Sequence, residues 1–250
     1  MGTSQSSPGP GGSSPLVPPW ADNQPELPLL SPLPSRFKPF RQSLGDFVKS
    51  GNRSDLRHAV GHYARKASGG GSSAVRRLGS VTQAGGNLFG VLTGAPTAPG
   101  EPSVDLASLA GLPCETAISA ISHALSPEDG DSEKVRSAIN HALAEALDGV
   151  ETFDPDAITD DVIANTMIVY LAESIFLQIV MDSRNAWNKA ETPKQAIQAE
   201  TELRELIKVV VDKYMGPAVS ENVRSINQTE MIRIEREAIG EIWTEWESYQ

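Results

Sequence analysis

The sequence contains very little cysteine and histidine, and this scarcity excludes several classes of protein. A single cysteine, Cys114, among 250 residues cannot build a disulfide framework within one chain or a site with several thiolate ligands. The four histidines have no spacing of the His-Glu-x-x-His kind, so neither a metal nor another cofactor is predicted. This usage of cysteine is typical of a reducing compartment, and we expect a cytoplasmic protein.

Strand-like alternation is also missing, and the N-terminus has no secretory signal. The one long apolar run, 162–181, contains Asn165, Glu173 and Gln178, so a core helix is favoured over a membrane span and no membrane partner is expected. Helical periodicity predicts further helices at 103–110, 114–126, 132–148, 155–189, 193–215 and 217–248. The predicted class is all-α, with a disordered N-terminal tail rich in proline, glycine and serine.

Positive charge is absent from residues 1–35, which carry Asp22 and Glu26 but no lysine or arginine. Residues 36–77 invert the balance to +8, and residues 78–250 carry −17. Helices are predicted at about 35–50, from Ser54 or Asp55 to the glycines at 69–71, and at 72–92. The last of these contains Gly79, Gly85, Gly86 and Gly90, which weaken the helix prediction but permit close helix contact. The predicted organisation is a tail at 1–35, a basic helical region at 36–95, a linker at 96–102 and an acidic helical domain at 103–250.

The tail contains an apolar strip that ends in an aromatic residue. The strip consists of Pro15, Leu16, Val17, Pro18, Pro19 and Trp20. A proline-rich strip with one aromatic anchor suits a groove on a partner protein. Packing of Trp20 on the surface of its own chain is an equal alternative.

Seven basic residues are candidates for a docking face: Arg57, His58, His62, Arg65, Lys66, Arg76 and Arg77. Such a face binds phosphates or an acidic protein surface. Because the rest of the chain is strongly acidic, docking on this chain's own acidic half or on a partner protein is favoured over nucleic acid. The two histidines lie one helical turn apart without an evident third ligand, so no metal is predicted. The glycines at 69–71 are interpreted as a hinge rather than a phosphate-binding loop.

The first residues, Met1-Gly2-Thr3-Ser4, leave the amine of Gly2 at the terminus once Met1 is removed. An α-amine has a pKa near 8, so roughly a tenth of it is neutral at pH 7, far more than of a lysine. The first lysine is Lys38, which makes Gly2 the only good amine nucleophile of the tail. The same start fits N-myristoylation, but the tail has no cation to support a single acyl chain on a membrane.

Several of these residues resemble QatB of the bacterial Qat anti-phage defence system. The resemblance lies in Met1–Ser4, Gly9-Pro10, Pro15–Ala21, Arg36-Phe37, Leu44–Phe47, Ser50-Gly51, Leu56–Tyr63, Arg76–Gly79 and Ala84–Gly86. It covers roughly residues 1–95, and beyond them only helical character and length correspond. The resemblance implies a non-enzymatic component of a defence complex.

The resemblance also implies partners, because Qat systems pair QatB with a P-loop ATPase (QatA), a QueC-like enzyme (QatC) and a TatD-like nuclease (QatD). QueC-type enzymes activate the carboxylate of 7-carboxy-7-deazaguanine with ATP and pass it to an amine. We therefore predict that QatC attaches a deazaguanine group to Gly2 while it binds Thr3, Ser4 and the strip Pro15–Trp20. A free tail of 35 residues reaches about 115 Å. The alternative is a nucleic-acid-binding adaptor that recruits the nuclease through residues 36–77.

Overall fold

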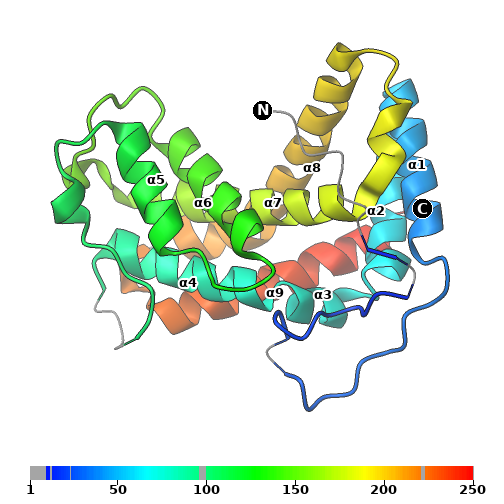
Figure 1. The fold of residues 1–250 in the computed structure, drawn as a ribbon, viewed down its shortest axis with the longest axis horizontal. Helices are drawn as coiled ribbons and strands as arrows, with labels where there is room; N and C mark the ends of the chain where they lie inside the picture. Colours follow the sequence, from blue (N-terminus) through cyan, green and yellow to red (C-terminus); the bar gives the residue numbers. More distant parts are fainter. Residues whose placement is uncertain (1–9, 12, 23, 96–99, 221–222, 250) are drawn as a thin grey trace. The chain divides into compact units, whose positions relative to one another are not determined.

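The computed structural model describes residues 10–11, 13–22, 24–95, 100–220 and 223–249 (Figure 1). In these residues the structure is helical, and the one β pairing is an isolated bridge between Pro113 and Thr152. The predicted all-α class is confirmed. The α-helices are α1 Phe37–Ser50, α2 Arg53–His62, α3 Gly71–Arg77, α4 Gly79–Thr93, α5 Cys114–Ala124, α6 Ser132–Ala146, α7 Asp160–Ser183, α8 Pro193–Ser220 and α9 Gln228–Glu247. A π-helical turn follows α2 at Tyr63–Ala67, and 3-10 turns lie at Leu106–Leu109, Pro155–Ala157, Arg184–Lys189 and Val223–Ser225.

Local signals set several helix ends. Gly51 ends α1, as predicted, with a left-handed φ of 69°. Asn52 accepts a hydrogen bond from the Ser54 N–H and begins α2, so this helix starts slightly before its predicted cap. The predicted helix at 72–92 is divided into α3 and α4, because the backbone of Leu78 has φ −95° and ψ 18°.

Two further predicted boundaries are wrong. The helix expected at 155–189 is interrupted on both sides of α7, and at its end Arg184 adopts a φ of 51°, which an α-helix does not accommodate. Pro217, expected to start a helix, lies inside α8. Its missing N–H removes one hydrogen bond close to the end of the helix, which stops at Ser220, so the loss is confined to the last turns.

The chain divides into two compact units, which are described separately. Unit 1 consists of residues 1–77, 175–207 and 239–250, and unit 2 consists of residues 78–174 and 208–238. The helices α7, α8 and α9 each contribute one part to either unit. The division therefore follows the packing of long helices and does not coincide with the change in composition at 96–102.

The core of unit 1 contains a row of aromatic rings from segments that are distant in the sequence. Phe40, Tyr63, Trp243 and Trp246 are almost completely buried. The centroids of successive rings are 4.9, 6.2 and 5.2 Å apart, which is the range of tilted aromatic pairs. These rings join α1, the π-helical turn and the end of α9. Next to them, α1 and α2 pack against each other (Figure 1).

In unit 2, α4 packs closely against α9 at two glycines. A Cβ atom on Gly86 would lie 2.5 Å from Cγ1 of Ile232, and one on Gly85 would overlap the carboxyl group of Glu235. Of the four glycines that were expected to permit close helix contact, these two make one. In the same core, the hydroxyl of Tyr170 donates a hydrogen bond of 2.7 Å to the carbonyl of Val81. The helices α5 and α6 pack side by side (Figure 1).

The helix α7 is one of the most apolar helices of the protein. With the turn after it, this segment is long and apolar enough to cross a membrane, but 78% of its most apolar window is buried inside the protein. Three of its polar side chains, Glu173, Gln178 and Asp182, are buried as well. This burial agrees with the predicted core helix.

Candidate functional site

We call residues 1–35 the leader. Its described residues form neither helix nor strand, in agreement with its composition. Leu16, Val17 and Ala21 are nevertheless buried in a small cluster, which the partly buried Leu29 joins. Leu16 covers Gly69, where a Cβ atom would lie 2.8 Å from Leu16 Cδ1 and where φ is +82°. The leader belongs to unit 1 itself, and its described residues pack on the rest of that unit, over the glycine loop that was interpreted as a hinge.

Arg36, directly before α1, holds the first part of the leader. Its guanidinium donates hydrogen bonds to the carbonyls of Ser14 and Pro15, at 2.8 and 3.3 Å. The same group stacks over the ring of Phe37, 4.7 Å from the centroid. Burial lowers the pKa of Arg36, and the nearby carboxylate of Asp182 opposes this shift. The side chain is therefore a buried cation whose donors point at the backbone of the leader.

Arg41, in the second turn of α1, holds the leader further upstream. Its guanidinium donates to the carbonyl of Pro10 at 3.0 Å and to the carbonyl of Asp182 at 2.8 Å. It lies on the ring of Phe37, at 4.5 Å from the centroid. Burial and, after it, the charge of Arg184 lower the pKa of Arg41 to about 10, so the group remains charged at neutral pH.

Arg76 of α3 holds the middle of the leader. Its Nε and Nη2 atoms donate to the two carboxylate oxygens of Asp22 at 2.9 and 2.7 Å, and Nη2 also donates to the carbonyl of Gln24 at 2.8 Å. The hydrogen bond with Arg76 lowers the pKa of Asp22 and raises that of Arg76, so both groups are ionised at neutral pH. This candidate of the predicted docking face is bound to an acidic residue of its own chain.

Two other members of the predicted docking face bind the C-terminal end of unit 1. Arg65 donates hydrogen bonds to the backbone carbonyls of Glu247 and Tyr249, at 2.5 and 2.6 Å. The guanidinium of Arg57 lies 5.7 Å from the centroid of the Tyr249 ring. Arginines of the basic residues 36–77 therefore bind both the leader and the C-terminal segment within the same unit.

The remaining members are more accessible. Lys66 is exposed, and His58, His62 and Arg77 are partly exposed. Burial, followed by the charges of Arg65 and Lys66, lowers the pKa of His62, so this imidazole is neutral at pH 7. Within the described ranges, no three His, Cys, Asp or Glu side chains gather closely enough to hold a metal ion. The seven residues are thus divided between internal contacts and the surface.

A buried polar network lies next to the arginines that hold the leader. The hydroxyl of Tyr63 donates to Oδ2 of Asp182 at 2.8 Å, and Gln178 donates to the same oxygen at 3.2 Å. Burial and the charge of Asp182 raise the pKa of Tyr63 well above its usual value. Tyr63 begins the π-helical turn, a distortion that often marks functional regions. The sequence analysis missed Arg36, Arg41 and Asp182, although an acid at the end of an apolar helix was an available signal.

The predicted partner-binding strip is divided between the interior and the surface. Leu16 and Val17 are buried at 7% and 4% exposure, whereas Trp20 is 51% exposed. The neighbouring Pro15 and Pro19 are exposed, and Pro18 is partly exposed. The predicted modification site and its neighbours lie outside the described residues: Gly2, Thr3 and Ser4. The described strip therefore packs through its aliphatic residues and presents its aromatic end.

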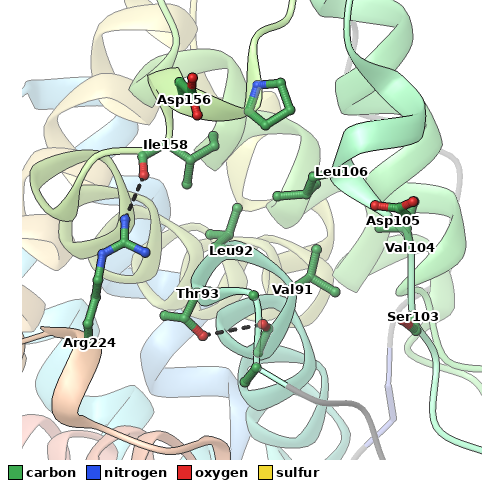
Figure 2. Close-up of a pocket in the computed structure, with 14 residues that line it drawn as sticks. Val91, Leu92, Thr93, Ser103, Val104, Asp105, Leu106, Asp156, Ile158 and Arg224 are labelled. Carbon is green, nitrogen blue, oxygen red and sulfur yellow. Dashed lines mark hydrogen bonds between the residues drawn. The ribbon is translucent and has the colours of Figure 1, made fainter.

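Unit 2 contains a cleft of about 400 Å³ at the end of α4 (Figure 2). Segment 103–106, the turn Pro155–Ala157 and Arg224 complete its walls. Arg224 donates to the carbonyl of Ile158 at 3.0 Å, as Figure 2 shows, and to Asp160 at 2.5 Å. The guanidinium of Arg224 thus makes local contacts. Among the described residues that line the cleft, no nucleophile and base are hydrogen-bonded to each other.

Two titratable groups of unit 2 are buried without a catalytic arrangement. Cys114 begins α5, where burial and then the charge of Glu115 raise the pKa of its thiol. Glu235 of α9 is completely buried, and neither of its oxygens has a hydrogen-bond partner among the described residues. Burial raises the pKa of Glu235 well above its usual value, which favours the protonated carboxyl group.

Taken together, the helices and the arginine contacts define an all-α protein that holds an irregular leader on one of its two units. A family model described as Qat anti-phage system associated protein QatB matches residues 69–245. The chain therefore belongs to the QatB family and is a component of the Qat anti-phage system, which implies partner proteins in the same system. A search among curated proteins and a search among solved structures found no match.

The match extends the resemblance seen in the sequence. That resemblance covered roughly residues 1–95, and it overlaps the matched region only at 69–95. Beyond residue 95, the resemblance rested only on helical character and length. The family model matches this part of the chain as far as Glu245. The suspected family is confirmed, and its sequence signal extends over most of the chain.

Proposed function

We propose that this chain is the scaffold and the acceptor protein of its defence complex, and that the QueC-like partner QatC attaches a 7-deazaguanine group to the amine of Gly2. The observation that carries this proposal is the absence of lysine and arginine from residues 1–35. The first side-chain amine belongs to Lys38 in α1. At neutral pH the terminal amine is also far less protonated than a lysine, so it is the better nucleophile.

The proposed reaction is an acyl transfer. The neutral Gly2 amine attacks the carboxyl carbon of 7-carboxy-7-deazaguanine, which the partner has activated with ATP. The new bond is an amide, the activating group leaves with the electron pair of its bond, and the amine gives up a proton. In this role the chain supplies the nucleophile and the partner supplies the catalytic groups.

The contacts of the leader support this role, because they limit where the terminus can be found. Arg41 binds the carbonyl of Pro10, and the eight residues from Gly2 to Gly9 span at most about 29 Å when extended. This value replaces the reach of about 115 Å that a wholly free tail would have. We propose that the enzyme approaches unit 1 in the cytoplasm and binds Thr3, Ser4 and the exposed Trp20, while Leu16 and Val17 keep the strip on its own chain.

Mass spectrometry of the first peptide, after co-expression with the neighbouring genes of the system, tests the proposal. We expect a mass increase of one deazaguanine acyl group on Gly2, and no increase when the partner enzyme is inactivated. The variant Lys38→Arg is the matched control and keeps the increase. An unchanged Gly2 terminus in the presence of active QatC and its precursor contradicts the proposal.

A further inference from the structure

We propose that residues 24–35 form a separate docking surface, in which three leucines of the leader enter an apolar groove on another protein of the defence complex. Leu27, Leu30 and Leu33 are 51%, 74% and 62% exposed. Large apolar side chains with such exposure are few in the described part of the chain, and the others are Trp20, Met181, Ile197 and Val209. Three of them thus lie within seven consecutive residues, which marks an interaction surface.

The leucines follow a turn. Leu27 ends this turn, where its N–H donates to the carbonyl of Gln24 at 3.0 Å, and the irregular stretch after it contains Leu30 and Leu33. The three leucines have the spacing of one face of an extended segment. They recur every third residue, and prolines lie between and beside them at 25, 28, 32 and 34. A polyproline II helix has three residues per turn, so side chains at i, i+3 and i+6 line one side of it. Residues 28–33 form no helix, turn or strand. Leu29 packs instead against the buried cluster of Leu16, so one leucine attaches the segment and its neighbours remain exposed.

Both ends of this segment are attached to unit 1. At its start, Arg76 binds the carbonyl of Gln24 and the carboxylate of Asp22. At its end, the N–H of Arg36 donates to the carbonyl of Leu33 at 3.3 Å, and the Arg36 guanidinium is itself bound and buried. A segment with fixed ends loses less conformational entropy on binding than a free chain does. The structure therefore presents the leucines in advance of binding.

The occupant that fits is a different protein with a groove lined by aliphatic and aromatic side chains. Membership of the QatB family implies partner proteins in the same system. The segment contains no cation before Arg36 and one acid, Glu26, which makes it unsuited to phosphate-rich partners. The four prolines lack backbone donors, which opposes strand pairing with a second copy of the chain. This docking is independent of any modification at Gly2.

The test uses the full chain, tagged and co-expressed with the other proteins of the system. We expect the amount of one partner protein that co-purifies with the variant Leu27→Ser/Leu30→Ser/Leu33→Ser to fall by at least about tenfold, because three apolar contacts are lost. The matched control is Ile197→Ser/Val209→Ser, which removes side chains that are 64% and 68% exposed on α8 and keeps the partner. Gly2 modification is measured separately in both samples.

Equal retention of all partners by the triple variant overturns the proposal, and so does an equal loss in the α8 control. Light scattering of the purified chain provides a further test. A concentration-dependent dimer that the triple variant abolishes would assign the surface to a second copy and also overturn the proposal. If the triple variant unfolds at a lower temperature than the wild type, the single variant Leu30→Ser is judged by the same criteria, because Leu30 is the most exposed of the three.

Discussion

The carboxylate of Asp22 accepts two hydrogen bonds from the guanidinium of Arg76, at 2.9 and 2.7 Å, and both side chains are more than nine-tenths buried. This pair connects the leader to α3 across 54 residues of sequence. With Arg36 and Arg41, it attaches to unit 1 a segment whose composition alone favours disorder. The described residues of the leader are therefore part of the tertiary structure.

Replacement of Asp22 tests this attachment. We expect Asp22→Ala to speed chymotrypsin cleavage within residues 16–33 by at least about tenfold at pH 7.5, because local opening exposes the chain to the protease. The variant Glu26→Ala, which removes an exposed acid of the same segment, is the control and cleaves at the wild-type rate. Since its pKa is lowered in the folded chain, Asp22 stabilises the attachment above about pH 3.8 and loses this effect as the pH falls through the folded value. Equal cleavage of both variants would contradict the role of the pair.

The hydroxyl of Tyr63 is predicted to stabilise unit 1 through Asp182. The variant Tyr63→Phe removes one of the donors to this buried carboxylate, the one at 2.8 Å, so we expect the free energy of unfolding to fall by about 1.5–3 kcal/mol. The variant Tyr249→Phe removes a hydroxyl that donates to Glu245 near the surface, and the expected change is within about 0.5 kcal/mol. Urea denaturation at pH 7 measures both. Similar losses of unfolding free energy in the two variants would contradict the prediction that the buried hydroxyl contributes more than the one near the surface.

Glu235 is predicted to make the stability of unit 2 depend on pH. Its folded pKa is raised above the unfolded value of about 4.5, so the stability is complete below that pH and is lost as the pH rises towards the folded value. We expect the free energy of unfolding to fall by up to about 1.4 kcal/mol per pH unit in this window, and Glu235→Gln to remove this slope. The control Glu241→Gln changes an exposed acid of α9. Parallel pH profiles for the wild type and Glu235→Gln would exclude a buried, protonated Glu235.

The two glycines of α4 at positions 86 and 90 provide a matched pair. A Cβ atom at Gly86 would lie 2.5 Å from Ile232, so we expect Gly86→Ala to destabilise the protein by about 1–3 kcal/mol. At Gly90 the nearest atom would be 3.8 Å away, and Gly90→Ala should stabilise the helix by about 0.5–1 kcal/mol. Thermal unfolding of the two variants shows whether their midpoints move in opposite directions. A shift in the same direction would argue against close packing of α4 on α9.

The helical class was predictable because the signals involved are local. Apolar side chains recur with helical spacing, and Gly51 and Pro193 act on the residues beside them. The four glycines of 72–92 permitted a close helix contact, but the sequence indicated neither which of them would make it nor with which helix. The helix boundaries predicted at Arg184 and Pro217 were wrong because they depend on tertiary contacts. The surrounding structure can sustain an unfavoured φ or keep a proline inside a helix.

The amino-acid order thus specified the helices, the unequal distribution of charge and the absence of lysine and arginine from the leader. Only the folded chain revealed that the leader lies on unit 1, that Arg36, Arg41 and Arg76 bind it, and that Leu27, Leu30 and Leu33 remain exposed. The physical reason is that these contacts join residues far apart along the chain. The composition does not show which of the ten lysines and arginines in residues 36–77 bind the leader. Burial in the tertiary structure selects the few that do.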